Sequence, residues 1–384
     1  MEVRVRFAPS PTGFLHVGGL RTALYNYLFA RKHNGKMILR IEDTDRTRLV
    51  ENAIDNLINS LKWAGIEYNE GPDKAGEYGP YIQSERLDIY KKYALELVEK
   101  GLAYYAFDTS DEIEEMRKNS SETFGTKYNR EAMRNQLTLG EDETKKILAS
   151  GHDFVIRLMV PFDHEVSFND IIRGEVKVST NDIDDQVLLK SDGFPTYHLA
   201  NVVDDHLMKI SHVIRGEEWL PSTPKHVLLY NYFGWEIPKF AHLPLLLNKD
   251  KSKLSKRQGS VAVEDFREKG YLKDAFINFI ALLGWNPTGD REIYSLDELI
   301  EYFNLEKVNK GGAVFDVQKL DWVNQQYLKS VNFKEVANEL SLVANEKFGK
   351  LYDSEFLNKV FNLFKERVMS NPKLHLLQII CFPI

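Results

Sequence analysis

The order of elements in the N-terminal segment constrains the fold more than any other feature of the sequence. Apolar residues alternate with arginines across residues 3–7, which predicts a short strand. A loop rich in proline and glycine follows at 9–19, and apolar residues then recur at helical spacing across 20–31. A second strand is predicted at 37–41 and a second helix at 53–61. Strand, helix, strand and helix in this order predict a parallel α/β sheet.

The middle of the chain does not continue this alternation of strands and helices. A predicted helix at 85–100 is followed by a polar helical stretch at 111–119 and by alternating apolar residues at 154–160. The segment QVLLKSDGFPTYHLA (186–200) has a DG turn between two β-rich runs, which predicts a hairpin. We therefore interpret this part as an α+β insertion into the first domain.

Helical sequence returns in the C-terminal third. Helices are predicted at 223–233 and 271–283, and Gly284 directly after the second is typical of a helix C-terminus. Ser295 and Glu298 have the spacing of a capping box, which predicts another helix start. The remainder of the chain has helical character.

Size and composition narrow the class of protein. A chain of 384 residues predicts two to four domains, and 43% hydrophobic with 28% charged residues is ordinary for a soluble globular protein. No stretch approaches the roughly 18 apolar residues that span a bilayer, and the N-terminus lacks the apolar core of a signal peptide. We therefore expect a cytoplasmic protein that is not inserted in a membrane.

Charge is uneven along the chain. The net charge of −7 argues mildly against nucleic-acid binding, but residues 1–50 hold nine Arg and Lys against four Asp and Glu, a local balance of +5. A basic face on an acidic body could bind a phosphate-rich ligand. Such unevenness is also common in proteins that bind no such ligand.

The first motif with chemical content is His16-Val-Gly18-Gly19, in the loop that leads into the first predicted helix. Unpaired N–H groups at a helix N-terminus favour phosphate, and glycines allow a nucleotide to approach the backbone. His16 could donate to phosphate oxygens. The alternative is a loop that simply needs glycine and proline in order to turn.

The second motif is Lys253-Leu-Ser255-Lys256-Arg257, within NKDKSKLSKRQGS. Two ammonium groups three residues apart could hold a triphosphate and stabilise the departing pyrophosphate. The alternative is a solvated, lysine-rich loop.

Together, HVGG and KLSKR resemble the two signatures of class I aminoacyl-tRNA synthetases. RFAPSPTG at the N-terminus, RIEDTDRTR at 40–48, EGP at 70–72, SDGFPTYHLANVVDDHLM at 191–208 and VIRGEEWLPSTPKH at 213–226 resemble, more narrowly, the bacterial-type glutamyl-tRNA synthetase family. The resemblance covers about residues 1–330 and is specific, because several long motifs occur in the family's order.

The resemblance implies an ATP-dependent ligase that activates glutamate to glutamyl-adenylate and then transfers it to the 3′ end of tRNA(Glu). Such a reaction needs positioning and charge stabilisation but no covalent enzyme intermediate. Carried over by motif, catalysis rests on His16, Lys253 and Lys256. ATP binding is implied for Thr12, His16, Gly18, Glu218, Leu246 (at the adenine), Lys253, Ser255 and Lys256.

Glutamate binding is implied for a second set of residues. Arginine suits the side-chain carboxylate because its fork of N–H groups binds both oxygens. The resemblance assigns this role to Arg6 and Arg215, the α-amino group to Glu42, and further contacts to Ser10, Tyr197 and Asn201. As alternatives, Arg6 could face solvent from its strand, and Arg215 could be an ion-pair partner of Glu217.

The implied architecture is α/β. It comprises a Rossmann-like parallel-sheet catalytic domain (1–100 and 200–245), an inserted α+β domain for the acceptor end of tRNA (101–199), a stem-contact region with the KLSKR loop (246–323), and a partial α-helical anticodon-binding domain (324–384).

Three features depart from the family's commoner pattern. HVGG lacks the final histidine of the commoner HIGH form, and Arg257 replaces a final serine. The stretch AYYAFDT (103–109) has no cysteine where some relatives hold zinc, and the chain has one cysteine, Cys381, so we expect no zinc. Mg²⁺ is expected only with ATP. We expect a monomer.

The end of the sequence also departs from the family. Relatives extend well past residue 384, and the last eleven residues, LHLLQIICFPI, carry no formal charge with histidine neutral. This segment either packs against the body or marks an altered end, and we favour the altered end. Anticodon recognition is then expected to be impaired, while adenylate chemistry could survive.

Three rival interpretations are weaker. An enzyme that glutamylates a modified tRNA nucleoside usually stops after the catalytic part, unlike this chain. A glutaminyl-tRNA synthetase would have less use for two arginines and has a β-barrel anticodon domain. A tRNA-binding protein without catalysis would not need His16, Lys253 and Lys256.

Overall fold

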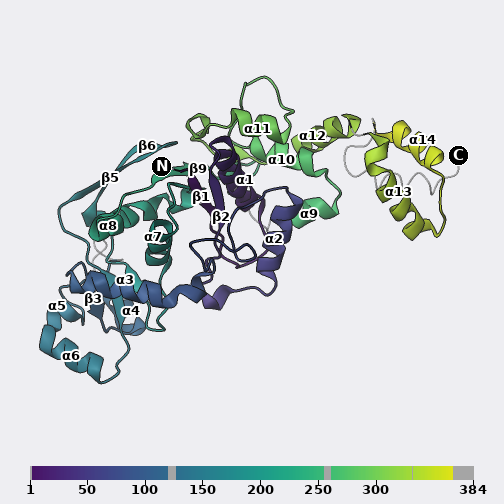
Figure 1. Cartoon of the computed structure of the whole chain (residues 1–384). Helices are drawn as coiled ribbons and strands as arrows, with labels where there is room; N and C mark the ends of the chain where they lie inside the picture. The colour runs from purple at the N-terminus through teal and green to yellow at the C-terminus, as the bar shows by residue number, and fades with distance from the viewer. Residues whose placement is uncertain (1, 120–126, 255–260, 331, 366–384) are drawn as a thin grey trace. The chain divides into compact units, whose positions relative to one another are not determined.

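The computed structural model describes residues 2–119, 127–254, 261–330 and 332–365, and Figure 1 labels the helices and strands along the chain. The chain divides into two compact units. Unit 1 comprises Met1–Thr12, Gly35–Val50 and Tyr68–His242, and unit 2 comprises Gly13–Asn34, Glu51–Glu67 and Leu243–Ile384. Ser255, Lys256 and the C-terminal segment 366–384 lie outside the described residues.

A parallel pair of strands begins unit 1. Strand β1 (Arg4–Phe7) pairs in parallel with β2 (Lys36–Leu39), and single parallel bridges continue the pattern from Ile38 to Glu70 and from Ile41 to Ile82. The predicted Rossmann-like α/β fold is confirmed. Every residue of β1 is buried, including Arg4 and Arg6.

The remainder of unit 1 has mixed α and β structure. Its two larger sheets have the strand orders β3-β4-β7 and β6-β5-β9-β8, and the second of them joins strands from inside and outside the predicted insertion at 101–199. The strands of unit 1 after β2 are β3 (Ala103–Ala106), β4 (Val155–Leu158), β5 (Glu165–Asp170), β6 (Gly174–Ser179), β7 (Val187–Leu189), β8 (His212–Gly216) and β9 (Lys239–Leu243). Its helices are α3 (Leu87–Glu99), α4 (Ser110–Asn119), α5 (Gln136–Leu139), α6 (Glu141–Ala149), α7 (Tyr197–Leu207) and α8 (Thr223–Phe233), with short 3-10 turns between them.

The predicted hairpin at 186–200 is only half present. The turn exists: Gly193 has φ +82° and its N–H donates to the carbonyl of Lys190. The second arm makes a single bridge, from Pro195 to Leu189, and helix α7 then begins at Tyr197. The second β-rich run of the predicted hairpin forms a helix, because its apolar residues bury one helical face that includes Leu199 and Val203.

One apolar cluster holds unit 1 together. It joins residues of the parallel strands, of α3, α7 and α8, and of the two larger sheets of unit 1. Examples are Ile38, Tyr90, Leu199, Leu229 and Phe240, which are all at most 2% exposed. Side chains beside this cluster are therefore held by a rigid scaffold.

Unit 2 is mainly helical. Its elements are α1 (Val17–Lys32), α2 (Ala53–Trp63), β10 (Leu246–Leu247), α9 (Val263–Glu268), α10 (Lys273–Ala281), α11 (Leu296–Tyr302), β11 (Ala313–Val314), α12 (Val317–Ser330), α13 (Phe333–Phe348) and α14 (Ser354–Phe364). The buried Tyr25 hydroxyl donates to the carbonyls of Ala281 and Leu283, which ties α1 to the end of α10. The predicted capping box of Ser295 and Glu298 is confirmed at the start of α11. Within the described residues, no helix is long and apolar enough to cross a membrane.

Candidate functional site

Unit 1 contains a buried network of opposite charges around Arg40. Its guanidinium lies 2.8 Å from Oδ1 of Asp205 and 3.1 Å from Oε1 of Glu42, and Nη2 also donates to Oδ1 of Asn201 at 3.2 Å. Asp204, on the same turn of α7, accepts from Arg86, Gln83 and Tyr90, and its Oδ2 also lies 3.8 Å from Nε of Arg40. These contacts give Asp204 and Asp205 a structural role.

Arg6 joins this network from strand β1. It is 3% exposed, so a solvent-facing position is wrong. Its Nε donates to Oδ1 of Asp205 at 3.0 Å, and its Nη2 donates to Oδ1 of Asn201 at 3.1 Å. Within the described part of the chain, Nη1 of Arg6 donates to no neighbour and remains as a donor for a ligand. Three of the predicted glutamate-binding residues, Arg6, Glu42 and Asn201, thus lie on one network.

The two carboxylates of this network differ in their proton affinity. Burial tends to raise both pKa values. For Asp205 the nearby Arg6 and Arg40 outweigh burial, and its pKa lies below the ordinary value. For Glu42 burial outweighs the attraction of the same two arginines, and its pKa is raised. Glu42 would hold its charge better beside a further cation, which is what an ammonium group supplies.

Arg215, at the end of β8, has a different environment. It is 5% exposed and makes five hydrogen bonds: to Nε2 of His242, the Tyr197 hydroxyl, Nδ1 of His226, the Trp219 carbonyl and the Thr223 hydroxyl. All five acceptors are uncharged. Among the described residues Arg215 forms no ion pair, and the proposed partner Glu217 pairs with Arg173 instead. A buried cation without a carboxylate is costly, and a bound anion would relieve that cost.

The histidines around Arg215 are uncharged near neutral pH. Burial lowers the pKa of His242 to about 4 and that of His198 to about 3. Burial together with Arg215 lowers the pKa of His226 well below its ordinary value. His226 Nδ1 accepts from Arg215, and its Nε2 faces Nδ1 of His198 at 3.2 Å. These rings supply hydrogen-bonding atoms without adding charge.

Tyr197 completes this side of the site. Its hydroxyl accepts from Nη1 of Arg215 at 2.7 Å, and its ring packs on Trp219 with centroids 4.1 Å apart. Burial raises the pKa of Tyr197 to about 12, so the hydroxyl keeps its proton. The hydroxyl can therefore donate to a carboxylate while it accepts from Arg215.

Ser10, Thr12 and Glu218 are exposed residues of unit 1. Thr12 N–H donates to the Ser10 carbonyl at 2.8 Å, which closes a tight turn. Glu218 folds back over Gly216, where a Cβ would meet its carboxylate at about 2.2 Å, so a side chain at position 216 would displace Glu218. Their predicted roles towards substrate stay predictions.

In unit 2, His16 is the N-cap residue of α1. Its Nδ1 accepts from the Gly18 N–H at 3.0 Å, which places the proton of the neutral ring on Nε2. The Val17 N–H donates to the Val261 carbonyl at 2.9 Å. The expectation of an open helix N-terminus must be corrected here, because two of its N–H groups already bond within the protein.

Lys253 lies in a tight hairpin of unit 2. The Leu254 N–H donates to the Leu246 carbonyl at 2.9 Å, and the Asn248 N–H donates to the Ser252 carbonyl at 2.8 Å. Lys253 is exposed, as a lysine that binds a soluble anion must be. The side chain of Leu246 is 5% exposed, and its contact with adenine stays a prediction. Ser255 and Lys256 follow outside the described residues.

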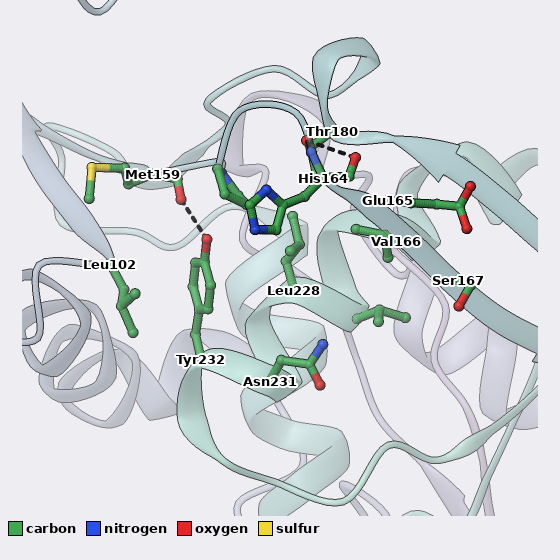
Figure 2. Close-up of a pocket in the computed structure, with 12 residues that line it drawn as sticks. Leu102, Met159, His164, Glu165, Val166, Ser167, Thr180, Leu228, Asn231 and Tyr232 are labelled. Atoms are coloured by element: carbon green, nitrogen blue, oxygen red, sulfur yellow. Dashed lines mark hydrogen bonds between the residues drawn. The ribbon is translucent and has the colours of Figure 1, made fainter.

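A pocket of about 560 Å³ lies elsewhere in unit 1, beside β5 and α8 (Figure 2). None of the predicted site residues that the structure describes lines it. The Tyr232 hydroxyl donates to the Met159 carbonyl at 2.7 Å, and the Thr180 hydroxyl donates to the His164 carbonyl at 3.1 Å, as Figure 2 shows. With these groups engaged, the wall offers mostly apolar surface.

The described residues contain no group of three or more His, Cys, Asp or Glu side chains placed to hold a metal ion. The stretch AYYAFDT (103–109) begins with strand β3.

Sequence reasoning missed several residues that shape the site. His242 and Asp170 are buried around Arg215 but belong to no motif that the sequence singled out. Thr223 is buried there too, and it lies within the motif VIRGEEWLPSTPKH but was given no role. Arg40 could have been found, because Arg40 and Glu42 are two residues apart in an extended segment and so share one face.

The chain was compared with known families, curated proteins and solved structures. A model of the family described as tRNA synthetases class I (E and Q), catalytic domain, matches residues 2–322. A glutamate–tRNA ligase of Chloroherpeton thalassium is 55% identical over 380 residues, which are 95% of this chain and 76% of the relative. A glutamate–tRNA ligase of Clostridioides difficile is 50% identical, over 96% of this chain and 77% of that protein.

The solved structures that resemble this chain are enzymes of the same kind. A glutamate tRNA ligase from Elizabethkingia meningosepticum, crystallised in complex with its amino acid, superimposes with a TM-score of 0.91 at 47% identity. The match covers 96% of this chain and 78% of that chain.

Proposed function

The chain belongs to the class I tRNA synthetase family for glutamate and glutamine, and we propose that it is the ligase that joins glutamate to tRNA(Glu) using ATP. The relatives compared above are glutamate–tRNA ligases at 50–55% identity. In the first step the α-carboxylate of glutamate attacks the α-phosphate of ATP, and pyrophosphate leaves. In the second, the terminal hydroxyl of tRNA attacks the adenylate carbonyl, and AMP leaves.

The observation that carries the choice of glutamate is the environment of Arg215. A buried guanidinium with five uncharged acceptors and no carboxylate partner suits an anionic side chain better than an amide. Tyr197 would donate to the same carboxylate, and Arg6 would add a second cation through Nη1. Glu42 would accept the α-amino group, while Asn201 and Ser10 complete the hydrogen bonds.

The nucleotide side of the proposal uses the two signature motifs. His16 would donate from Nε2 to phosphate oxygens, and Gly18 would allow close approach of the nucleotide. Lys253 and Lys256 would neutralise charge on the departing pyrophosphate, with Ser255 as a further contact. Thr12, Glu218 and Leu246 would contact the remainder of ATP.

Mg²⁺ enters this proposal with ATP, as part of the substrate. No protein-bound zinc is proposed, because the stretch at 103–109 offers no thiolate. We further propose a cytoplasmic monomer, since the family acts in translation on free tRNA.

The proposed domain roles follow the predicted boundaries. Residues 101–199 would contact the acceptor end of tRNA, 246–323 its stem, and 324–384 the anticodon arm. Residues 1–100 and 200–245 would form the catalytic domain.

Aminoacylation of tRNA tests the proposal. Labelled glutamate, but not glutamine, should be joined to tRNA(Glu) in the presence of ATP. A tRNA that lacks its terminal adenosine is the matched control and should accept nothing. Transfer to that shortened tRNA would support the rival that modifies an internal nucleoside, and a preference for glutamine would overturn the proposed specificity.

A further inference from the structure

A chain of three buried side chains ends at Arg215. Asp170, His242 and Arg215 lie on β5, β9 and β8, which are consecutive neighbours in one sheet. His242 Nδ1 lies 2.6 Å from Oδ2 of Asp170, and His242 Nε2 lies 3.0 Å from Nε of Arg215. Both Asp170 and His242 are at most 3% exposed. Three adjacent strands therefore hold this chain in place.

The direction of each hydrogen bond in the chain is fixed. Oδ1 of Asp170 accepts from the backbone N–H groups of Ile172 and Arg173, both at 2.9 Å, so this carboxylate is held as an acceptor. His242 must then donate from Nδ1, which leaves the lone pair on Nε2. Arg215 has only donors, and its Nε–H meets that lone pair.

The same contacts decide which edge of Arg215 faces a ligand. Nε donates to His242 and Nη2 donates to Thr223 Oγ1 at 2.9 Å, so the protein fills the edge formed by these two nitrogens. Nη1 is on the other side, where its partners are the Tyr197 hydroxyl at 2.7 Å and Nδ1 of His226 at 3.3 Å. A carboxylate that approaches at Nη1, beside Tyr197, would take the place of the longer of these contacts, the one to His226.

The uncharged ring of His242, between Asp170 and Arg215, also leaves the positive charge of Arg215 available to the ligand. A carboxylate in direct contact with Arg215 would compete with the side chain of glutamate. Because His242 stands between them, Asp170 orients the guanidinium without forming an ion pair with it.

We infer that Asp170 and His242 are positioning residues that orient Arg215 to bind the side-chain carboxylate of glutamate. The inference rests on the proposed function and goes beyond it, since it assigns part of the affinity for glutamate to two residues that touch no substrate. If the inference is right, affinity for glutamate depends on the acceptor atom of residue 242 that faces Arg215 and not on the volume of the ring alone.

Two substitutions at position 242 separate the role of this acceptor atom from that of the ring volume. His242→Gln can present an oxygen near the position of Nε2, which faces Arg215. His242→Asn can present a polar atom near the position of Nδ1, which faces Asp170, but leaves Arg215 without its acceptor. His206→Gln is the matched control, because His206 stacks on Trp235 with centroids 3.8 Å apart and lies outside this chain of contacts.

ATP–pyrophosphate exchange in the presence of tRNA measures the effect. His242→Asn should raise the KM for glutamate about tenfold or more, as expected for a lost hydrogen bond to a charged group. The KM for ATP and kcat should stay within about twofold. His242→Gln should retain most of the affinity, and His206→Gln should match the wild type.

Other outcomes contradict the inference. Equal effects of His242→Gln and His242→Asn, or a fall in kcat with an unchanged KM for glutamate, would assign His242 a purely structural role. If His242→Asn does not fold, Thr223→Val removes the other acceptor on the same edge and should raise the KM for glutamate in the same way. An unchanged KM in that variant would also overturn the inference.

Failure of the proposed function is a separate result. A wild-type protein that shows no exchange with glutamate and tRNA, even when the C-terminal part found in relatives is added, would refute the proposed reaction. Calorimetric titration of the wild type and the His242 variants with glutamate then tests the positioning role alone. Equal affinity of His242→Asn and wild type for glutamate would overturn it.

Discussion

Arg40 and Asp205 form a fully buried ion pair, with Nη1 of Arg40 2.8 Å from Oδ1 of Asp205 and neither side chain exposed. The same oxygen of Asp205 accepts from Arg6 at 3.0 Å. One structural pair thus fixes the position of an arginine that is proposed to bind substrate. We therefore expect affinity for glutamate and stability of unit 1 to be coupled at this point.

Replacing Arg40 should destabilise the protein strongly. Arg40→Met leaves Asp205 and Glu42 buried with less positive charge, and we expect a loss of about 3–5 kcal/mol in the free energy of unfolding. Denaturant unfolding measures it. Arg48→Ala, at an exposed pair with Asp45, is the control and should change stability by less than about 1 kcal/mol. Similar losses in the two variants would contradict the role of the buried network.

Arg215 should behave differently from Arg40, although both are buried. Arg215→Met leaves no carboxylate unpaired within the described residues, so its loss of stability should be smaller than that of Arg40→Met. Glutamate affinity should fall at least about 100-fold, as when one partner of a buried charge pair is removed. Calorimetric titration and denaturant unfolding of both variants test this. An Arg215→Met protein that still binds glutamate would remove Arg215 from the site.

His16 has two separable roles that two variants can distinguish. His16→Ala removes the cap of α1 and should reduce stability by about 1 kcal/mol, whereas His16→Asn restores a good capping side chain. Both variants lose the Nε2 donor, so both should slow ATP–pyrophosphate exchange, by about 100-fold if one donor to transition-state charge is lost. Full activity in His16→Asn would show that the histidine acts only as a cap.

Stability should fall as the pH falls below the ordinary histidine pKa. The lowered pKa values of His198, His226 and His242 mean that the unfolded chain binds more protons between about pH 6.5 and about pH 4. Each such histidine should contribute about 1 kcal/mol less stability at about pH 5.5 than at about pH 7.5. The raised pKa of Glu42 acts in the opposite sense, because protonation of a carboxyl with a raised folded pKa favours the folded state.

Denaturant unfolding at these two pH values checks this prediction. His198→Asn should lower the difference in unfolding free energy between them by about 1 kcal/mol. An unchanged difference in the variant would show that His198 is charged, or solvated, in the folded protein.

The sequence predicts the elements that follow strong periodicity and clear caps. Helix α8 has the predicted bounds, and the capping box at Ser295 is present, because both depend on residues close in the chain. The predicted hairpin at 186–200 is only half present, because burial against distant residues decided that its second arm continues as a helix.

The site could be predicted only where a motif marks it. Arg6 and Arg215 were found through motifs, but the reason why one is ion-paired and the other is not lies in partners far away in sequence. Asp170 is 72 residues from His242, and Asp205 is 199 residues from Arg6. Only the folded chain brings these partners together.

The most direct test of the account is ATP–pyrophosphate exchange by the 384-residue chain with glutamate or glutamine, each with and without tRNA(Glu). The account predicts exchange with glutamate and tRNA together, and none with glutamine. Exchange that prefers glutamine, or that is absent with glutamate and tRNA even when the C-terminal part found in relatives is added, would contradict it.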